Sequence, residues 1–205
     1  MQRHIPELLA ELDEQRMWGD LLYIAEDPLP FRKANHCLPG HDKNTLQETD
    51  VFVTNRLAAC GYQVERESCL VQPFGRDVTK PIRHQYAPPV PETPSYTADN
   101  LYAQKSGNLE PEEIILLLAH KDSQSWIDSP GAYDNAAGTV ALLELARVLA
   151  AYPTKRTVRF LFCNEEHTPW TSITAAQNAR DRGDNLIYIA NIDSLGGKSA
   201  EDIEA

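Results

Sequence analysis

The sequence predicts an α/β fold, a three-layer sandwich in which a mixed, largely parallel sheet is flanked by helices. From residue 96 onwards, short apolar runs alternate with amphipathic stretches, which is typical of strands joined by crossover helices. Histidine and carboxylate side chains follow the ends of several apolar runs. Because the carboxyl ends of such strands open into a crevice, these side chains can converge on one point.

Length and composition limit the number of domains and the possible partners and location of the protein. A chain of 205 residues suits one domain, and a net charge of −11 disfavours nucleic acid and anionic membranes as partners. The apolar run 114–119 is far shorter than the roughly 20 residues that span a bilayer. The first 15 residues are charged and have no apolar core of a secretory signal, so we expect a cytoplasmic location. The four cysteines lack metal-ligand spacing and are expected to be free thiols.

The N-terminal residues 1–44 are expected to form a helical extension. Apolar side chains at mostly helical spacing predict one or two amphipathic helices over residues 5–25, and a proline-rich loop follows over residues 27–43. His36, Cys37 and His41 lie in this loop. Because no fourth ligand lies nearby in the sequence, a structural role is favoured over a zinc site for these three residues.

A helix is predicted from residue 45 to Gly61, since glycine suits the left-handed position that ends a helix. Residues 62–74 alternate in polarity as a strand does. Residues 75–94 are rich in proline and charge and are expected to form a flap-like loop, of a length that is often functional inside a compact domain. Residues 96–104 are predicted to be the next strand.

The rest of the chain alternates strands with helices. We expect a strand over residues 114–119, a helix over 135–151, a strand over 157–163, a helix over 172–182 and a strand over 186–192. The ends of these elements carry His120, Asp122, Asp134, Glu165, Glu166 and Asp193. Imidazole and carboxylate groups suit Zn²⁺, and one carboxylate can bridge two ions about 3.5–4 Å apart.

Asp122 lies two residues from His120 and is a candidate acceptor for the ring N–H that a metal leaves free. Glu165 and Glu166 directly follow an apolar strand, where adjacent carboxylates repel each other unless a cation is present. Because adjacent side chains diverge, one can bind metal while the other takes a proton from the attacking water. Each residue alone also has a structural explanation, as a buried histidine, a solvated pair or a turn cap. Their order at successive strand ends favours the metal site.

The motifs LLLAHKDS, SPGAYDNAAGTVALLELARVLA, KRTVRFLFCNEE and IANIDSLGG resemble those of the M28 family of zinc-dependent metallopeptidases. These are chiefly aminopeptidases and carboxypeptidases with the α/β fold of zinc-dependent exopeptidases, and the resemblance covers roughly residues 101–197. It implies a cis peptide between Asp134 and Asn135. It also implies that His120 and Asp193 bind one zinc ion, Asp134 bridges two, Glu166 binds the second, Glu165 is the general base and Asp122 orients His120.

The resemblance implies a zinc-dependent exopeptidase, most simply an aminopeptidase that acts on peptides with up to two Zn²⁺ ions. A glutaminyl-cyclase-like acyltransferase is an alternative, since that group shares the fold and uses similar ligands for one zinc ion. The segment DNAAGT resembles the peptidases more closely. A catalytically impaired or non-enzymatic homologue that serves as a binding domain is the third reading.

The sequence departs from the family pattern in two ways. Tyr133 stands where the family most often has an aspartate, at a position that is not the bridging ligand. The family's second zinc ion takes a further histidine from beyond Asp193, whereas this sequence has no histidine after His167. The chain is therefore expected to be either a piece of a longer enzyme or a shortened homologue. His167, next to Glu166, is a weak substitute, because neighbouring side chains rarely aim at the same ion. We therefore expect metal to prefer the site of His120, Asp134 and Asp193.

Overall fold

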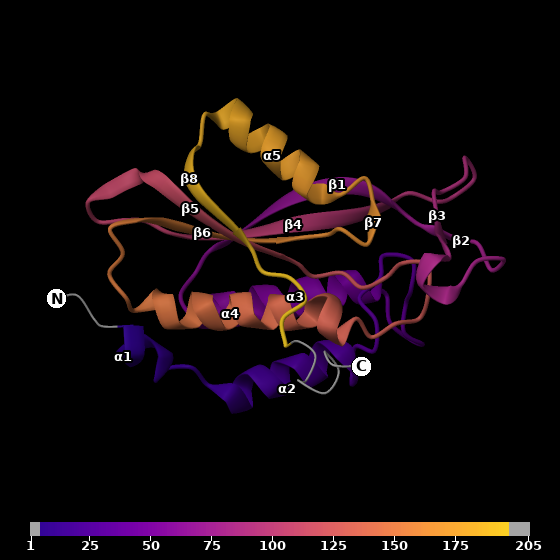
Figure 1. The fold of residues 1–205 in the computed structure, drawn as a ribbon, viewed down its shortest axis with the longest axis horizontal. Coiled ribbons are helices and arrows are strands. Elements are labelled where there is room, and N and C mark those ends of the chain that lie inside the picture. Colours follow the sequence, from indigo (N-terminus) through magenta and orange to yellow (C-terminus); the bar gives the residue numbers. More distant parts are fainter. Residues whose placement is uncertain (1–4, 197–205) are drawn as a thin grey trace.

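A six-stranded sheet runs through the middle of the computed structural model, which describes residues 5–196 (Figure 1). Helices α3 and α4 cover one face of the sheet, α5 covers the other, and α1 and α2 lie beyond α4. The predicted sandwich of helices around a mixed sheet is confirmed. The helices are α1 (Ile5–Leu9), α2 (Glu14–Ala25), α3 (Thr45–Ala59), α4 (Ala137–Ala150) and α5 (Thr171–Arg182).

The sheet has the strand order β7-β1-β4-β6-β5-β8. Its strands are β1 (Val64–Pro73), β4 (Tyr96–Lys105), β5 (Glu110–His120), β6 (Arg156–Cys163), β7 (His167–Thr168) and β8 (Asn185–Asn191). Two short strands, β2 (Gly75–Arg76) and β3 (Tyr86–Ala87), pair with each other in the flap-like segment, with a 3₁₀ turn at Ile82–His84 between them.

The parallel part of the sheet is smaller than the sequence predicts. Strand β5 runs parallel to β6 and to β8, whereas the β7–β1, β1–β4 and β4–β6 pairs are antiparallel. Parallel neighbours need a crossover connection. Helix α4 supplies it between β5 and β6, and α5 lies in the connection that runs from β6 past β5 to β8. The segment between β1 and β4 has no such helix, which is why these strands pair in opposite directions.

The main core lies between the sheet and helices α3 and α4. Its buried side chains include Val53, Leu57, Leu101, Leu142, Ala146, Phe160 and Phe162. A smaller cluster of Leu161, Cys163 and Ala175 lies under α5 on the opposite face. Because β5 and β6 are packed from both sides, their carboxyl ends are held firmly where the predicted site begins.

Two of the element boundaries that differ from the predictions have a clear physical reason. Strand β5 begins at Glu110, because Glu110 pairs with Arg156 of β6 and extends the ladder. Helix α4 begins at Ala137 and is preceded by a π-helical turn at Ala132–Ala136, in which Asp134 and Asn135 have non-helical backbone angles. The Asn135 side chain accepts the Gly138 N–H at 2.9 Å and so replaces a helical bond at the start of α4.

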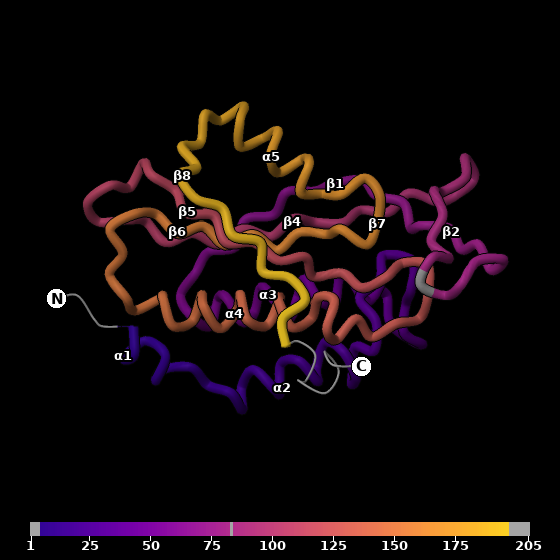
Figure 2. Tube along the Cα trace, viewed as in Figure 1, coloured from indigo at the N-terminus to yellow at the C-terminus, as the bar shows by residue number. Residues whose placement is uncertain are grey.

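The last described segment leaves β8 and crosses the carboxyl edge of the sheet towards α4 and α2 (Figure 2). Ile192 continues the pairing with β5, since its N–H donates to Leu118 O at 2.8 Å. None of the helices between residues 5 and 196 is long and apolar enough to cross a membrane.

Candidate metal centre

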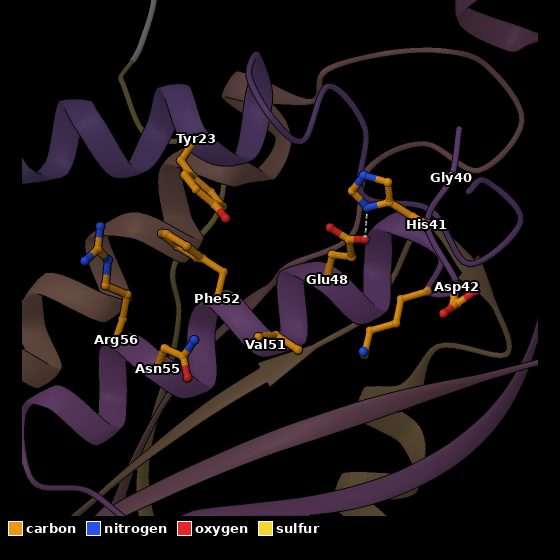
Figure 3. Close-up of a pocket in the computed structure, with 10 residues that line it drawn as sticks. Tyr23, Gly40, His41, Asp42, Glu48, Val51, Phe52, Asn55 and Arg56 are labelled. Atoms are coloured by element: carbon orange, nitrogen blue, oxygen red, sulfur yellow. Dashed lines mark hydrogen bonds and ion pairs between the residues drawn. The ribbon is translucent and has the colours of Figure 1, made fainter. Parts of the chain in front are cut away.

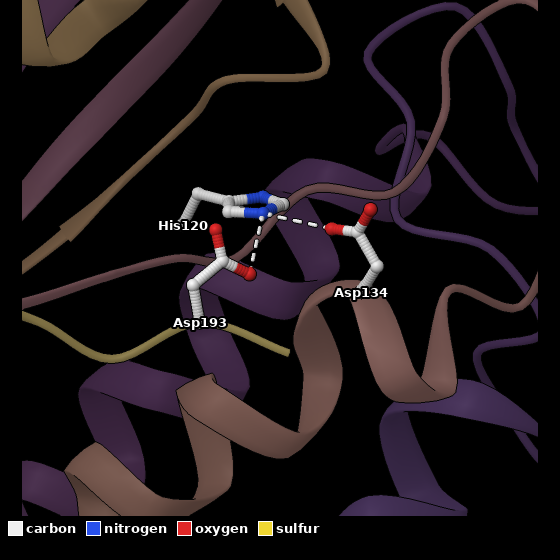
Figure 4. A group of neighbouring side chains, drawn as sticks. All are labelled: His120, Asp134 and Asp193. Atoms are coloured by element: carbon white, nitrogen blue, oxygen red, sulfur yellow. Dashed lines mark ion pairs between the residues drawn. The ribbon is translucent and has the colours of Figure 1, made fainter. Parts of the chain in front are cut away.

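Three of the predicted ligands meet at the carboxyl edge of the sheet (Figure 4). His120 is the last residue of β5, Asp134 lies in the turn before α4, and Asp193 follows β8. His120 Nε2 lies 3.0 Å from Asp134 Oδ1 and 3.7 Å from Asp193 Oδ1. One ligand atom from each residue lies within 4.8 Å of the other two. Within residues 5–196, no other group of three or more histidine, cysteine or acidic side chains is close enough together to hold a metal ion.

The sheet and one asparagine bring these ligands together. His120 and Asp193 end or follow neighbouring parallel strands, so both reach the same edge. Asn135 Nδ2 donates to Ile192 O at 2.9 Å, and Asn135 Oδ1 accepts the Ser194 N–H at 3.2 Å. These bonds join the turn that carries Asp134 to the segment that carries Asp193. The Asp134–Asn135 peptide is cis, as the family resemblance implies.

Asp122 is fully buried behind His120 and accepts four hydrogen bonds. Its Oδ1 lies 3.2 Å from His120 Nδ1, the contact that the predicted orienting role requires. The backbone N–H groups of Glu165 and Glu166 donate to its two oxygens at 2.9 and 2.8 Å. One carboxylate therefore fixes both the imidazole at the end of β5 and the Glu165–Glu166 backbone after β6.

These contacts perturb the ionisation of the site. Burial opposes ionisation of Asp122, but hydrogen bonds from His120 and His167 hold the pKa of its carboxyl well below the usual range. Burial lowers the pKa of His120, yet its bonds to Asp122 and Asp134 outweigh this effect and raise it to about 10. In the metal-free protein the imidazole therefore carries the positive charge that the surrounding carboxylates need.

The two glutamates after β6 differ in their surroundings. Burial, followed by the charges of Asp122 and Asp134, raises the pKa of Glu166 to about 8. Glu166 therefore lies within the electric field of the cluster, although it is not one of the three grouped ligands. Glu165 is partly exposed, and the Cys163 thiol lies 3.9 Å from its Oε1. A cation beside Glu166 would stabilise its ionised form.

His167 does not face the proposed metal centre. It is fully buried, its Nδ1 donates to Asp122 Oδ2 at 2.8 Å, and its Nε2 accepts the Ala34 N–H at 3.1 Å. Both ring nitrogens are therefore engaged away from Asp134 and Glu166. The idea that His167 serves as a substitute ligand is overturned, because β7 pairs with β1 and turns this side chain into the interior.

Two further residues contact the site and were missed from the sequence. Gln124 Nε2 lies 3.4 Å from Asp134 Oδ2. The Ser125 hydroxyl donates to Glu166 O at 2.5 Å and accepts the Phe74 N–H at 2.9 Å, which ties the start of the flap-like segment to the second glutamate. In the sequence, only their position directly after the AHKDS motif indicates that Gln124 and Ser125 lie near the site.

The loop with His36, Cys37 and His41 borders a different hollow, a groove of about 610 Å³ between α2 and α3 (Figure 3). There His41 Nδ1 lies 2.5 Å from Glu48 Oε1, and Tyr23 stacks on Phe52. None of the predicted ligands lines this groove. Among the residues that the structure describes, these three do not belong to the group of side chains placed to hold a metal ion.

The cluster at the sheet edge fits a zinc ion. One imidazole nitrogen and carboxylate oxygens are preferred zinc ligands, and the second ring nitrogen of His120 already has its carboxylate partner. The Asp134 and Asp193 side chains are 42% and 38% exposed, so an ion held there would keep a coordination position accessible to solvent. An open coordination position is what distinguishes catalytic zinc sites from structural ones.

Comparisons with known proteins show the family of this chain. A family model for peptidase family M28 matches residues 100–203, just over half of the chain. A probable zinc metalloprotease of Pyrenophora tritici-repentis is 34% identical over 109 residues, which cover 50% of this chain and 25% of that protein. The chain spans about a quarter of the length of the curated relatives it matches first.

Solved structures share the fold. An aminopeptidase from Aneurinibacillus sp. strain AM-1 superposes with a TM-score of 0.69 and 16% identity, over 94% of this chain and 73% of that one. A glutaminyl cyclase of Bacteroides thetaiotaomicron superposes with a TM-score of 0.64 and 16% identity, over 92% of this chain and 64% of that one. The resemblance read from the motifs is confirmed, and the chain belongs to peptidase family M28.

Proposed function

We propose that this protein is a zinc-dependent exopeptidase of the aminopeptidase type, which hydrolyses the N-terminal residue from peptides. The observation that carries the proposal is the convergence of His120, Asp134 and Asp193 within 4.8 Å at the edge of the sheet. Membership of family M28 and the likeness of fold to an aminopeptidase support the same reaction class.

In this proposal His120, Asp134 and Asp193 would hold one zinc ion, and Asp134 and Glu166 would hold a second. Zinc supplies Lewis acidity, which polarises a scissile carbonyl and lowers the pKa of water to about 7. Asp122 keeps His120 oriented, since its contact with Nδ1 leaves Nε2 facing the two aspartates. The chain's own contribution is a set of ligands held in place before metal arrives.

Glu165 is the proposed general base. Its backbone is anchored by the 2.9 Å bond to Asp122, and its side chain is partly exposed, as a group that meets substrate must be. A carboxylate in this position takes a proton from the attacking water and passes it to the leaving amine. The backbone of Glu166 is anchored by the same carboxylate. Because the side chains of adjacent residues diverge, the two glutamates can take different roles.

Glu165→Gln in the zinc-loaded protein tests the proposal. Bound zinc should be retained, whereas hydrolysis of aminoacyl anilides should fall by about 10²–10⁴-fold, because the amide cannot accept the proton. Glu65→Gln, at an exposed glutamate of β1, is the matched control and should leave both unchanged. Unchanged turnover in Glu165→Gln would remove Glu165 from the mechanism. If the protein cyclises an N-terminal glutaminyl peptide and does not hydrolyse the anilides, the proposed function would be an acyltransferase and not a peptidase.

A further inference from the structure

Arg32 is a buried cation beside the metal centre. It lies between α2 and α3, outside the residues that match the family model, and its side chain is fully buried. Its guanidinium donates to four backbone carbonyls, at 2.7 Å to Ile24, 2.7 Å to Lys121, 2.6 Å to Pro130 and 2.9 Å to Gly131. Among the described residues, no carboxylate lies within ion-pair distance of it.

Burial of an unpaired cation is costly, so its position needs an explanation. Burial lowers the pKa of Arg32 to about 10, against the opposing charges of Asp122 and Asp134. The guanidinium therefore stays protonated at neutral pH. Its charge acts on Asp122, which orients His120, and on Asp134, the proposed bridging ligand. There it adds to the positive charge of His120 in offsetting the repulsion among the carboxylates.

The four carbonyls belong to segments that carry the site. Lys121 lies between His120 and Asp122, and Gly131 lies three residues before Asp134. The backbone of Arg32 adds a reciprocal pair of bonds to Ser123, in which Arg32 N donates to Ser123 Oγ at 3.0 Å and Ser123 N donates to Arg32 O at 2.9 Å. One residue of the N-terminal segment thus ties the end of β5 to the turn before α4.

The turn before α4 is fitted closely around this side chain. Gly131 has a φ of +56°, and a Cβ added there would lie 2.9 Å from Arg32 Nη2, 2.8 Å from Ser123 Cβ and 2.5 Å from Asp134 O. Gly131 O accepts both the Arg32 guanidinium and the Ala136 N–H. Displacement of the guanidinium would therefore shift the backbone that positions Asp134.

We propose that Arg32 is a positioning residue of the metal centre. It holds the strand end with His120 and the turn with Asp134 at their mutual spacing, and its charge offsets the repulsion among the site's carboxylates. The inference rests on the metal centre of the proposed function, but not on the peptidase reaction. It also couples residues 1–44 to metal binding, because the arginine comes from that segment.

Zinc affinity, measured by chelator competition without substrate, tests this inference. Arg32→Gln should bind zinc about 10- to 100-fold more weakly, the range found when partners of metal ligands are removed. Arg32→Lys keeps the charge and should recover part of the loss. Arg147→Gln is the matched control, since Arg147 also fastens the N-terminal segment, through Glu144 and the Glu11 carbonyl, but contacts no ligand. Its zinc affinity should equal that of the wild type.

The visible spectrum of the Co²⁺-substituted protein gives a second readout, because it reports ligand geometry rather than fold stability. We expect a changed spectrum in Arg32→Gln and an unchanged one in Arg147→Gln. Wild-type affinity and spectrum in an Arg32→Gln protein that unfolds cooperatively would overturn the inference. A wild-type protein that binds no zinc would also overturn it, whereas one that binds zinc without peptidase activity would contradict the proposed reaction alone.

If Arg32→Gln does not fold, amide hydrogen exchange of the wild-type protein decides the question. Zinc should slow exchange in residues 26–36 as well as in residues 121–136, because the arginine links the two segments. Exchange that slows only in residues 121–136 would show that the N-terminal segment is not coupled to the metal centre.

Discussion

His167 Nδ1 donates a hydrogen bond to Asp122 Oδ2 at 2.8 Å, and both side chains are fully buried. Because His167 Nε2 accepts the Ala34 N–H, the ring is neutral and carries its proton on Nδ1. The other oxygen of Asp122 faces Nδ1 of His120. One carboxylate therefore orients two imidazoles, one at the proposed metal centre and one that secures the N-terminal segment.

Asp122→Asn should weaken zinc binding about 10- to 100-fold, because the amide cannot accept from all four donors that now meet the carboxylate. Each buried donor left without an acceptor should also lower the free energy of unfolding by about 1–3 kcal/mol. Chelator competition and urea denaturation measure the two effects. Asp181→Asn, at an ion pair with Arg180 in which both side chains are exposed, is the control and should change neither. Wild-type zinc affinity in Asp122→Asn would contradict the orienting role.

His167→Ala should lower the free energy of unfolding by about 2–4 kcal/mol, since it removes a buried ring and two hydrogen bonds. Zinc stoichiometry should stay at the wild-type value, because the ring does not face the cluster. Urea denaturation and metal analysis of the folded protein give these quantities. His120→Ala, which removes a proposed ligand, should lose zinc under the same conditions. Loss of zinc from folded His167→Ala would make His167 a ligand after all.

Strand ends explain why part of the site was predictable. His120 and Asp193 each follow an apolar run that becomes a buried parallel strand, so the sheet edge alone brings them together. Asp134 is different, because its place depends on a turn closed by the Asn135 side chain. The sequence pattern placed Asp134 among the acidic residues at element ends, and only the family resemblance singled it out as the bridging ligand.

Long-range contacts explain what the sequence did not reveal. Arg32 meets a carbonyl 89 residues away, and His167 meets a backbone N–H 133 residues away. Such pairs follow from tertiary packing, which neither periodicity nor motif spacing encodes. By sequence, His167 beside Glu166 was a weak candidate for a substitute ligand, and the pairing of β7 with β1 turns its side chain into the interior.

The stability of the metal-free protein should depend on pH through Glu166. Burial, with Asp122 and Asp134, raises the pKa of Glu166 from 4.5 to about 8, so between these values the folded state holds a proton that the unfolded state has lost. The free energy of unfolding in chelator should therefore fall as the pH rises through this window, and the loss is complete above the folded pKa. Urea denaturation between pH 5 and about 9 measures the slope.

Glu166→Gln is the control for this pH dependence, because the amide does not titrate. The slope should become smaller but not vanish, since the raised pKa of His120 acts in the same direction above 6.5. An identical slope in Glu166→Gln would show that the carboxyl of Glu166 titrates as it does in the unfolded chain. The zinc-loaded wild type should show a flatter profile, because a cation replaces the proton.

At Gly138, α4 closely approaches the segment that carries Asp193. A Cβ added there would lie 2.2 Å from Asn135 Oδ1 and 2.3 Å from Ile192 O. Gly138→Ala should therefore cost about 1–3 kcal/mol of unfolding free energy and weaken zinc binding, because Asp193 moves with Ile192. Gly19→Ala in α2, where nothing lies within 4 Å, should instead stabilise by about 0.5–1 kcal/mol. Equal stabilisation by both substitutions, measured by urea denaturation, would mean that α4 does not approach this segment so closely.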